Sequence, residues 1–234
     1  MVDYGLGNLR AFEHIYGKLG LRVKIAKDST AIEVAEVLIL PGVGSFDWAM
    51  NKLNKSGMRS ALEDKALKQR TPILGVCVGM QILAEGSEEG QMSGFGWIEG
   101  KVRKLRMESE EGGVRKAIGG WPLTVGGPKA KSERLKTSRS VESTGELILP
   151  HMGWNNVEPA GRSALFDEIE KPQFYFLHSY YFVPSDPIHT LGETEYGIRF
   201  CSAVGKGNIY GVQFHPEKSH GWGIQLLKNF VEKC

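Results

Sequence analysis

Residues 75–81, GVCVGMQ, constrain the fold of this chain most, because they place Cys77 between glycines two positions to either side. The apolar residues Ile73 and Leu74 precede this segment, and a run typical of a helix follows it. A strand that turns sharply into a helix strains its central residue, and only glycines on both sides leave room for so tight a bend. We therefore predict a nucleophile elbow with an exposed Cys77 thiol, at a helix start that favours thiolate.

A lone cysteine in an apolar stretch is more often a small packing residue. Weighed against the elbow pattern, this leaves catalysis and packing about equally open for Cys77 alone. Residues 209–217, IYGVQFHPE, change this balance. Residues two apart in an extended chain point the same way, and His215 and Glu217 are such a pair. A carboxylate behind an imidazole fixes its tautomer and supports the imidazolium. We predict Cys77, His215 and Glu217 as catalytic residues; without the cysteine, His215 would be a structural histidine.

Length and composition indicate one α/β domain over residues 1–234. The net charge of +2 gives no reason to expect nucleic-acid binding, and no segment has the roughly 18 consecutive apolar residues of a membrane span. The three cysteines lack CxxC spacing, which argues against a disulfide framework or a metal site. The first residues lack the pattern of a signal peptide, so we expect a cytoplasmic protein.

Strand-like runs alternate with amphipathic helical patterns, which is typical of a mostly parallel sheet flanked by helices. We expect a helix over 9–19, a half-buried strand over 21–25, a strand in the short apolar run 37–40 that ends at a glycine-rich turn, and a closing helix around 226–231. The first strand has only Met1 and Val2 ahead of Asp3, so either the start of the chain is truncated or this strand is unusually short. Strands with turn residues after Gly100 predict a smaller antiparallel extension.

The stretch 108–146 departs from this alternation. It holds seven glycines and many lysines, arginines and serines, with little hydrophobic periodicity. We interpret it as a surface-loop insertion; its basic residues suit an anion, but a solvated loop is the commoner meaning of such a segment.

Beyond the cysteine and histidine segments, further blocks share one pattern. They are residues 3–9, 40–46, 87–90, 150–155, 178–181 and 214–219. Together these blocks resemble the class I, triad-type glutamine amidotransferases with a flavodoxin-like fold, and specifically the glutaminase subunit of imidazole glycerol phosphate synthase. Only residues from about 107 to 147 fall outside the resemblance.

An amide is a poor electrophile, so a glutaminase needs a nucleophile, a proton donor for ammonia and a site for the oxyanion. Cys77 would attack the carboxamide of L-glutamine, His215 would protonate the leaving ammonia, and water would hydrolyse the thioester. Backbone N–H groups of Val78 and of Val43 or Gly44 would hold the oxyanion. The alternative for residues 41–44 is an ordinary turn that ends a strand.

The resemblance also implies residues that bind glutamine and residues that meet a partner. The substrate-binding candidates are Gly42, Gln81, Glu85, Ser179 and Tyr180, and a shared helix face with Cys77 would bring Gln81 and Glu85 to one pocket. The partner is a (β/α)₈-barrel synthase, the cyclase subunit of a heterodimer, that receives ammonia to make imidazole glycerol phosphate in histidine biosynthesis. The interface candidates are Asn8, Trp154, Tyr175 and Lys218. No cofactor is implied.

Other functions fit the residues less well. A paralogous glutaminase that feeds a sugar-amination pathway would share the same chemistry, and the sequence does not separate the two. A cysteine peptidase or deglycase-like protein usually has histidine directly after its elbow cysteine, where this chain has Val78. A non-catalytic scaffold would not need Cys77, His215 and Glu217 together. Residues 5–10 lack the third glycine of a dinucleotide loop.

Overall fold

The computed structural model describes residues 1–107 and 147–234, so the insertion predicted at 108–146 lies outside the described residues. The described helices are α1 (Leu9–Lys18), α2 (Ser29–Glu33), α3 (Phe46–Lys55), α4 (Arg59–Glu63), α5 (Val78–Gln81) and α6 (His220–Lys233), with a π-helical turn η1 (Asp64–Lys68) and short 3₁₀ turns η2 (Ala164–Phe166), η3 (Pro187–His189) and η4 (Pro216–Lys218). The strands are β1 (Leu38–Gly42), β2 (Ile73–Cys77), β3 (Gly86–Ser87), β4 (Gly100–Lys104), β5 (His151–Asn156), β6 (Glu158–Pro159), β7 (Gln173–His178), β8 (Tyr180–Pro184), β9 (Thr190–Tyr196), β10 (Ile198–Lys206) and β11 (Ile209–Val212).

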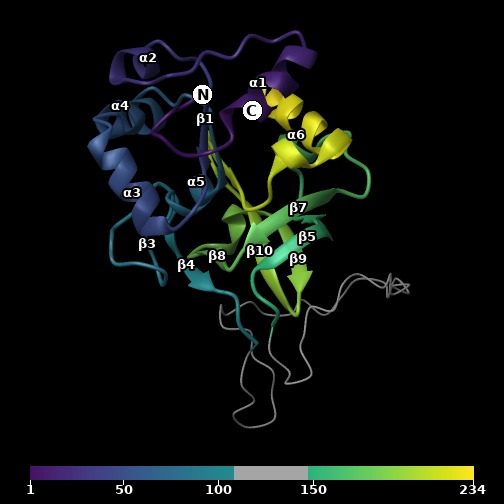
Figure 1. Ribbon diagram of the computed structural model, residues 1–234. Coiled ribbons are helices and arrows are strands. Elements are labelled where there is room, and N and C mark those ends of the chain that lie inside the picture. Colours follow the sequence, from purple (N-terminus) through teal and green to yellow (C-terminus); the bar gives the residue numbers. More distant parts are fainter. Residues whose placement is uncertain (108–146) are drawn as a thin grey trace.

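A six-stranded sheet in the order β1-β2-β11-β10-β9-β6 forms the centre of the molecule (Figure 1). Strands β1, β2 and β11 are parallel, whereas β10, β9 and β6 continue the sheet in antiparallel pairs. Two smaller sheets, β3-β4-β8 and β5-β7, complete the described strands. The α/β class with an antiparallel extension is thus confirmed, and the extension belongs largely to the same sheet as the parallel strands.

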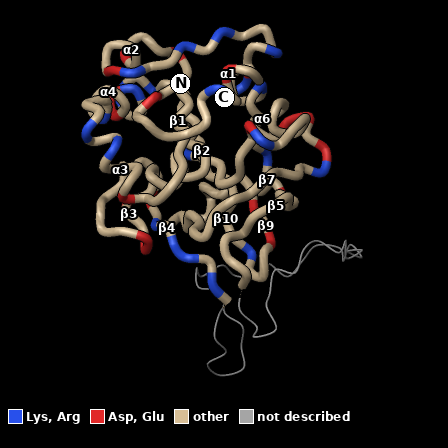
Figure 2. The backbone as a smooth tube through the Cα atoms, viewed as in Figure 1, with Lys and Arg blue, Asp and Glu red and all other residues tan. Residues whose placement is uncertain are grey.

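Helices cover both faces of this sheet, with α3 and α4 on one side and α1 and α6 on the other (Figure 1). The hydroxyl of Tyr16 on α1 donates a hydrogen bond to the carbonyl of Leu227 on α6, 3.2 Å away, which joins the two helices. Charged residues of both signs follow the helices, while the sheet core contains few of them (Figure 2). No helix in the described part of the chain is long and apolar enough to cross a membrane.

The beginning of the chain differs in part from expectation. The predicted strand at 21–25 is wrong: the segment forms no strand, and Leu21 is exposed. Only Ala26 pairs there, through an isolated parallel bridge to Val2, whose N–H also donates to the carbonyl of Ile39 at 3.0 Å. Alternation over five residues did not produce a strand, because the short partner at Met1 and Val2 offers too few backbone groups to pair with.

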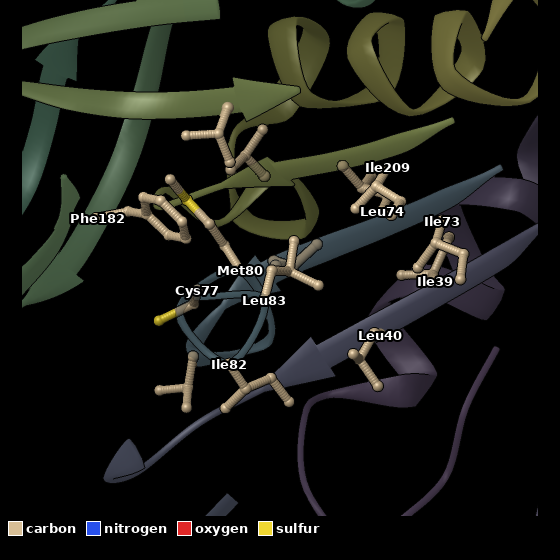
Figure 3. Packing of buried hydrophobic residues seen from close by; sticks show 14 of the residues in the cluster. Ile39, Leu40, Ile73, Leu74, Cys77, Met80, Ile82, Leu83, Phe182 and Ile209 are labelled. Atoms are coloured by element: carbon tan, nitrogen blue, oxygen red, sulfur yellow. The ribbon is translucent and has the colours of Figure 1, made fainter. Parts of the chain in front are cut away.

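Apolar side chains from β1, β2 and the segment after the elbow pack together beneath the site (Figure 3). Leu40, Leu74 and Met80 are fully buried in this core. Burying a side chain of this size contributes about 1.5–3 kcal/mol. The core therefore holds the end of β2, and with it Cys77, at a fixed place against β1 and β11.

Candidate active site

Cys77 ends β2 in the strained backbone conformation expected of an elbow, with φ 56° and ψ −114°. Positive φ in a residue other than glycine costs about 1–3 kcal/mol and persists only where the surroundings impose it. Here the surroundings are the flanking glycines. A Cβ on Gly75 would overlap the carbonyl of Gly79, and a Cβ on Gly79 would overlap the carbonyl of Leu40. The sequence therefore forms this bend because no side chain competes for the space.

Two details of the elbow differ from the prediction. The thiol is not exposed, because Cys77 keeps only 5% of its surface accessible among groups that are themselves buried. The helix after it, α5, has only four residues and ends at Gln81. Since a helix dipole grows with the number of aligned peptides, α5 contributes less to a thiolate than a long helix would. Side chains must supply most of the stabilisation of a thiolate at Cys77.

His215 follows β11 and is held by its backbone. Its N–H donates to the carbonyl of Tyr175 at 2.8 Å, and its own carbonyl accepts the Ser219 hydroxyl at 2.6 Å. Its Nδ1 lies 2.8 Å from Oε1 of Glu217, and both side chains are almost fully buried. The other ring nitrogen is left for Cys77, to which the imidazole is also hydrogen-bonded. The structure thus brings together the three residues predicted to form the triad.

Opposing effects act on the pKa of His215. Burial alone lowers it, but the hydrogen bonds to Cys77 and Glu217 outweigh burial and raise the pKa to about 10. The imidazolium is therefore the favoured form at neutral pH, and it faces a sulfur on one side and a carboxylate on the other. This arrangement supports a thiolate and places a proton beside it.

The predicted oxyanion turn lies next to the elbow. In the register of the parallel strands β1 and β2, Gly42 lies opposite Cys77, and a Cβ on Gly42 would overlap the backbone of Gly79. Gly44 has φ +90°, a conformation that favours glycine, and Val43 is 40% exposed. Val78 is the first residue of α5, so its N–H has no acceptor within the helix. The turn and the start of α5 therefore lie at the ends of adjacent strands, which is the placement that the predicted oxyanion site requires.

Tyr4 also holds this turn, although no role beyond membership of a motif block was predicted for it. Its buried hydroxyl donates to the carbonyl of Pro41 at 2.7 Å. Burial, followed by the nearby sulfur of Cys77, raises the pKa of Tyr4, so the hydroxyl keeps its proton and donates. A Cβ on Gly7 would meet the ring of Pro41 at 2.7 Å. The segment after β-bridge residue Val2 thus fixes the start of the turn.

The substrate-binding candidates do not all meet. The side-chain Nε2 of Gln81 donates to the carbonyl of Tyr180 at 3.1 Å and to Oε1 of Gln213 at 3.0 Å. Both of its hydrogens are therefore used, so Gln81 can act toward a ligand only as an acceptor. Ser179 lies between β7 and β8, and its carbonyl accepts the N–H of Leu105 at 2.9 Å.

Glu85 is not on a helix face shared with Cys77, because α5 ends four residues before it. The backbone of Glu85 pairs instead with Gly100, and its Oε2 lies 3.4 Å from the Gly100 N–H. The spacing argument was wrong because it assumed a helix longer than the fold allows. A different carboxylate reaches the oxyanion turn: Oε2 of Glu89 accepts the N–H of Phe46 at 2.7 Å, directly after that turn.

Three of the interface candidates form one cluster. The rings of Trp154 on β5 and Tyr175 on β7 lie 6.3 Å apart, centroid to centroid, and Nζ of Lys218 lies 5.7 Å from the Tyr175 ring. Asn8 is exposed at the start of α1, which packs against η4, the turn that contains Lys218. Tyr175 pairs directly with His215, Trp154 and Lys218 contact Tyr175, and Asn8 precedes the helix that contacts the Lys218 turn.

Gln213 was missed by the sequence reasoning although a signal for it existed. It precedes His215 by two residues, so it shares the orientation of His215 and Glu217 in an extended chain. Its Nε2 lies 3.9 Å from Sγ of Cys77. His151 and His178 belong to quoted sequence blocks without an assigned role, and the structure places them 3.0 Å apart, Nδ1 to Nε2. Within the described residues no cluster of histidine, cysteine or carboxylate side chains suits a metal ion.

Comparisons with known proteins agree with this geometry. The family model "Glutamine amidotransferase class-I" matches residues 1–234. The imidazole glycerol phosphate synthase subunit HisH of Bdellovibrio bacteriovorus is 42% identical over 99% of this chain and 98% of its own. HisH of Leptospira interrogans is 40% identical over 99% of this chain and 98% of its own, and HisH 2 of Pseudomonas aeruginosa is 39% identical over the same shares.

Solved structures show the same fold at much lower identity. A crystal structure of a glutamine amidotransferase has a TM-score of 0.66 at 17% identity and covers 99% of this chain and 96% of its own. A putative GMP synthase component from Thermoplasma acidophilum has a TM-score of 0.62 at 18% identity, covering 98% and 89%. From the full-length family match and these relatives, the chain belongs to the class-I glutamine amidotransferases and, within them, to the HisH subunits of imidazole glycerol phosphate synthase.

Proposed function

We propose that this chain hydrolyses L-glutamine to glutamate and ammonia, and that it passes the ammonia to a synthase subunit that makes imidazole glycerol phosphate. One observation carries the proposal: Sγ of Cys77 at a strained elbow is hydrogen-bonded to His215, whose Nδ1 is 2.8 Å from Glu217. The names of the HisH relatives favour this acceptor pathway over sugar amination.

The chemistry follows from the charges at the site. The Cys77 thiolate adds to the carboxamide carbon, and the oxygen gains the negative charge, which backbone N–H groups of Val78 and of Val43 or Gly44 would stabilise. The C–N bond breaks as the imidazolium of His215 gives its proton to the nitrogen, which leaves as ammonia. A water then attacks the thioester while His215 takes its proton, and glutamate and the thiolate are released. Glu217 orients His215 throughout and stabilises the imidazolium in the steps in which His215 is charged.

The ammonia requires a partner, because free ammonia at neutral pH is mostly ammonium and unreactive. We expect that partner, a (β/α)₈-barrel cyclase subunit, to dock on the outer face of β5 and β7. Met152 is 63% exposed there and lies opposite the exposed Leu177, and the pair Trp154 and Tyr175 continues the apolar row. Tyr175 accepts the backbone N–H of His215, so a protein bound on this face would lie one hydrogen bond from the triad.

The function is tested by measuring glutamate release from glutamine with and without the cyclase subunit. We expect turnover to rise with the cyclase and to be accompanied by imidazole glycerol phosphate when its nucleotide substrate is present. A barrel synthase from a sugar-amination pathway serves as the competing partner. Activation by that protein alone would contradict the proposed acceptor, and turnover equal with and without any partner would contradict the partner dependence.

Trp154→Ala is expected to weaken binding of the cyclase subunit by about tenfold, since large aromatic anchors at interfaces commonly contribute more than 1 kcal/mol. Trp154 also stacks on the ring of His220 at 5.2 Å, so the side chain is held in place before binding. Titration of the labelled cyclase measures the change. Ile188→Ala is the control, because Ile188 is 77% exposed on η3, a turn that contacts β10. Equal losses in the two variants would show that the β5–β7 face is not the docking site.

A further inference from the structure

Gln213 lies against the sulfur of Cys77 in a fixed orientation. Its side chain is fully buried, and its Nε2 is 3.9 Å from Sγ. Its Oε1 accepts a hydrogen bond from Nε2 of Gln81 at 3.0 Å. Because the oxygen is already directed at a donor, the nitrogen of Gln213 is the end of the amide that faces the sulfur. A flipped amide would place its oxygen against the sulfur and its N–H against the N–H of Gln81.

The donor direction of Gln81 is set in turn by a backbone carbonyl. Its second Nε2 hydrogen goes to the carbonyl of Tyr180 at 3.1 Å, which also accepts Nδ1–H of His178 at 2.8 Å. A carbonyl oxygen only accepts, so the nitrogen of Gln81 and Nδ1 of His178 must both carry hydrogens. The amide of Gln81 therefore cannot flip without losing both partners.

A separate row of hydrogen bonds runs from β5 to the same carbonyl of Tyr180. His178 is protonated on Nδ1, so when neutral its Nε2 accepts from Nδ1 of His151, 3.0 Å away. Nε2 of His151 then accepts from Nδ2 of Asn155 at 3.2 Å, and that nitrogen gives its other hydrogen to the carbonyl of Glu195 at 2.9 Å. Every donor and acceptor in this row is consistent with two neutral histidines. The row ends at Asn155, whose neighbour Trp154 points to the opposite face of β5.

We propose that Gln213 is a positioning residue for Cys77: its side-chain N–H holds the sulfur as thiolate beside His215, and Gln81, whose amide is fixed by the carbonyl of Tyr180, keeps that N–H directed at the sulfur. The proposal rests on Cys77 being the nucleophile of the proposed function. A buried thiolate needs donors, and α5, with four residues, supplies little of the dipole that longer helices provide. A donor aimed at an anion is stronger than one aimed at a neutral group, so the N–H favours the thiolate over the thiol.

The test measures how fast iodoacetamide alkylates Cys77 at pH 7, followed on the Cys77 peptide by mass spectrometry, together with kcat and KM for glutamine in the complex with the cyclase. In Gln213→Leu we expect both the alkylation rate and kcat to fall about tenfold while KM stays within about twofold, because a lost hydrogen bond to a charged group acts on the thiolate and not on substrate contacts. Gln69→Leu is the matched control, since Gln69 is exposed at the end of η1, and it should match the unmodified chain.

Gln213→Glu separates positioning from packing. This variant keeps the size of the side chain and the oxygen that accepts from Gln81, but replaces the N–H at the sulfur with an oxygen. We expect alkylation to fall further than in Gln213→Leu, because a carboxylate at this position would also repel the thiolate. Alkylation at the unmodified rate in either variant would overturn the proposal. Cys77 alkylation does not depend on glutamine turnover, so a failure of the proposed glutaminase activity would be seen separately, as activity that persists without Cys77.

Discussion

Cys77→Ala is expected to lower glutamate release in the cyclase complex by about 10⁴-fold or more, because removal of a nucleophile that acts together with a base removes the effect of the whole group. The other groups cannot replace it. His215 and Glu217 can still polarise a water, and the oxyanion N–H groups remain, so the residual rate should stay above that of uncatalysed hydrolysis. Glutamine binding is expected to change little, since the sulfur contacts only the reacting carbon.

The measurement is the amount of glutamate that the purified complex forms over hours. The melting temperature of the variant shows whether loss of the Cys77 side chain has destabilised the fold. Cys234→Ala is the matched control, because Cys234 is a partly exposed cysteine that hydrogen-bonds to Tyr210 and not to the triad. It should retain full activity. Turnover in Cys77→Ala within tenfold of the unmodified complex would exclude a thioester at this residue and, with it, the proposed reaction.

The sequence predicted the parts of the site that obey local rules. The spacing of Gly75 and Gly79 indicates a tight bend without any knowledge of the fold, and the structure shows that neither residue could carry a side chain. Likewise, the spacing of His215 and Glu217 depends only on alternation in an extended segment, and Nδ1 lies 2.8 Å from the carboxylate. That Cys77 meets this pair was inferred from chemistry, not from any local pattern.

The parts that failed depend on contacts between distant segments. Glu85 was placed by assuming helical continuation past Gln81, but backbone pairing of Glu85 with Gly100 ends the helical path first. The exposure of Cys77 was inferred from elbows in general, whereas burial here comes from Gln213 and His215, more than a hundred residues later in the chain. No window of the sequence contains both sides of such a contact.

The histidine pair shows the same limit. His151 and His178 lie opposite each other on β5 and β7, and this register exists only once the strands have paired. His151 also stacks on Phe176 and Tyr196, with ring centroids 4.7 and 4.0 Å away, so its surroundings are apolar. In the sequence, each histidine taken alone is interpreted as an ordinary core residue. Together they form a buried pair whose hydrogen bonds require both rings to be neutral.

This pair should make the fold sensitive to acid. Burial lowers the pKa of His151 to about 4, and burial followed by the neighbouring His151 lowers the pKa of His178 to about 3. An unfolded histidine titrates near 6.5. The unfolded chain therefore binds more protons than the folded chain below pH 6.5, and each histidine then lowers the free energy of unfolding by up to about 1.4 kcal/mol per pH unit until the pH reaches its folded value.

His215 acts in the opposite direction. Its folded pKa, about 10, lies above the unfolded value because the hydrogen bonds to Cys77 and Glu217 outweigh the effect of burial, which is to lower the pKa. Its contribution to stability is fully present below pH 6.5 and is lost as the pH rises toward 10. The two effects together place the greatest stability near neutral pH, with losses on both sides.

Comparing the unmodified chain with His151→Phe separates the effect of the histidine pair on the pH dependence of unfolding from the effects of His215 and of the carboxylates. We expect the unmodified chain to lose about 2 kcal/mol more unfolding free energy between pH 8 and pH 5 than His151→Phe does, because that variant has no imidazole to protonate at this position.

Phenylalanine retains the stack on Phe176 and Tyr196 but leaves Nε2 of His178 unpaired. The variant should therefore be less stable at pH 8, and only the dependence of its stability on pH is diagnostic. Urea unfolding at a series of pH values gives the free energies, and His14→Phe, at an exposed site on α1, should follow the unmodified chain. If His151→Phe shows the same loss between pH 8 and pH 5 as the unmodified chain, His151 is protonated in the folded protein, and the row of donors from Asn155 to the carbonyl of Tyr180 cannot run in the direction described.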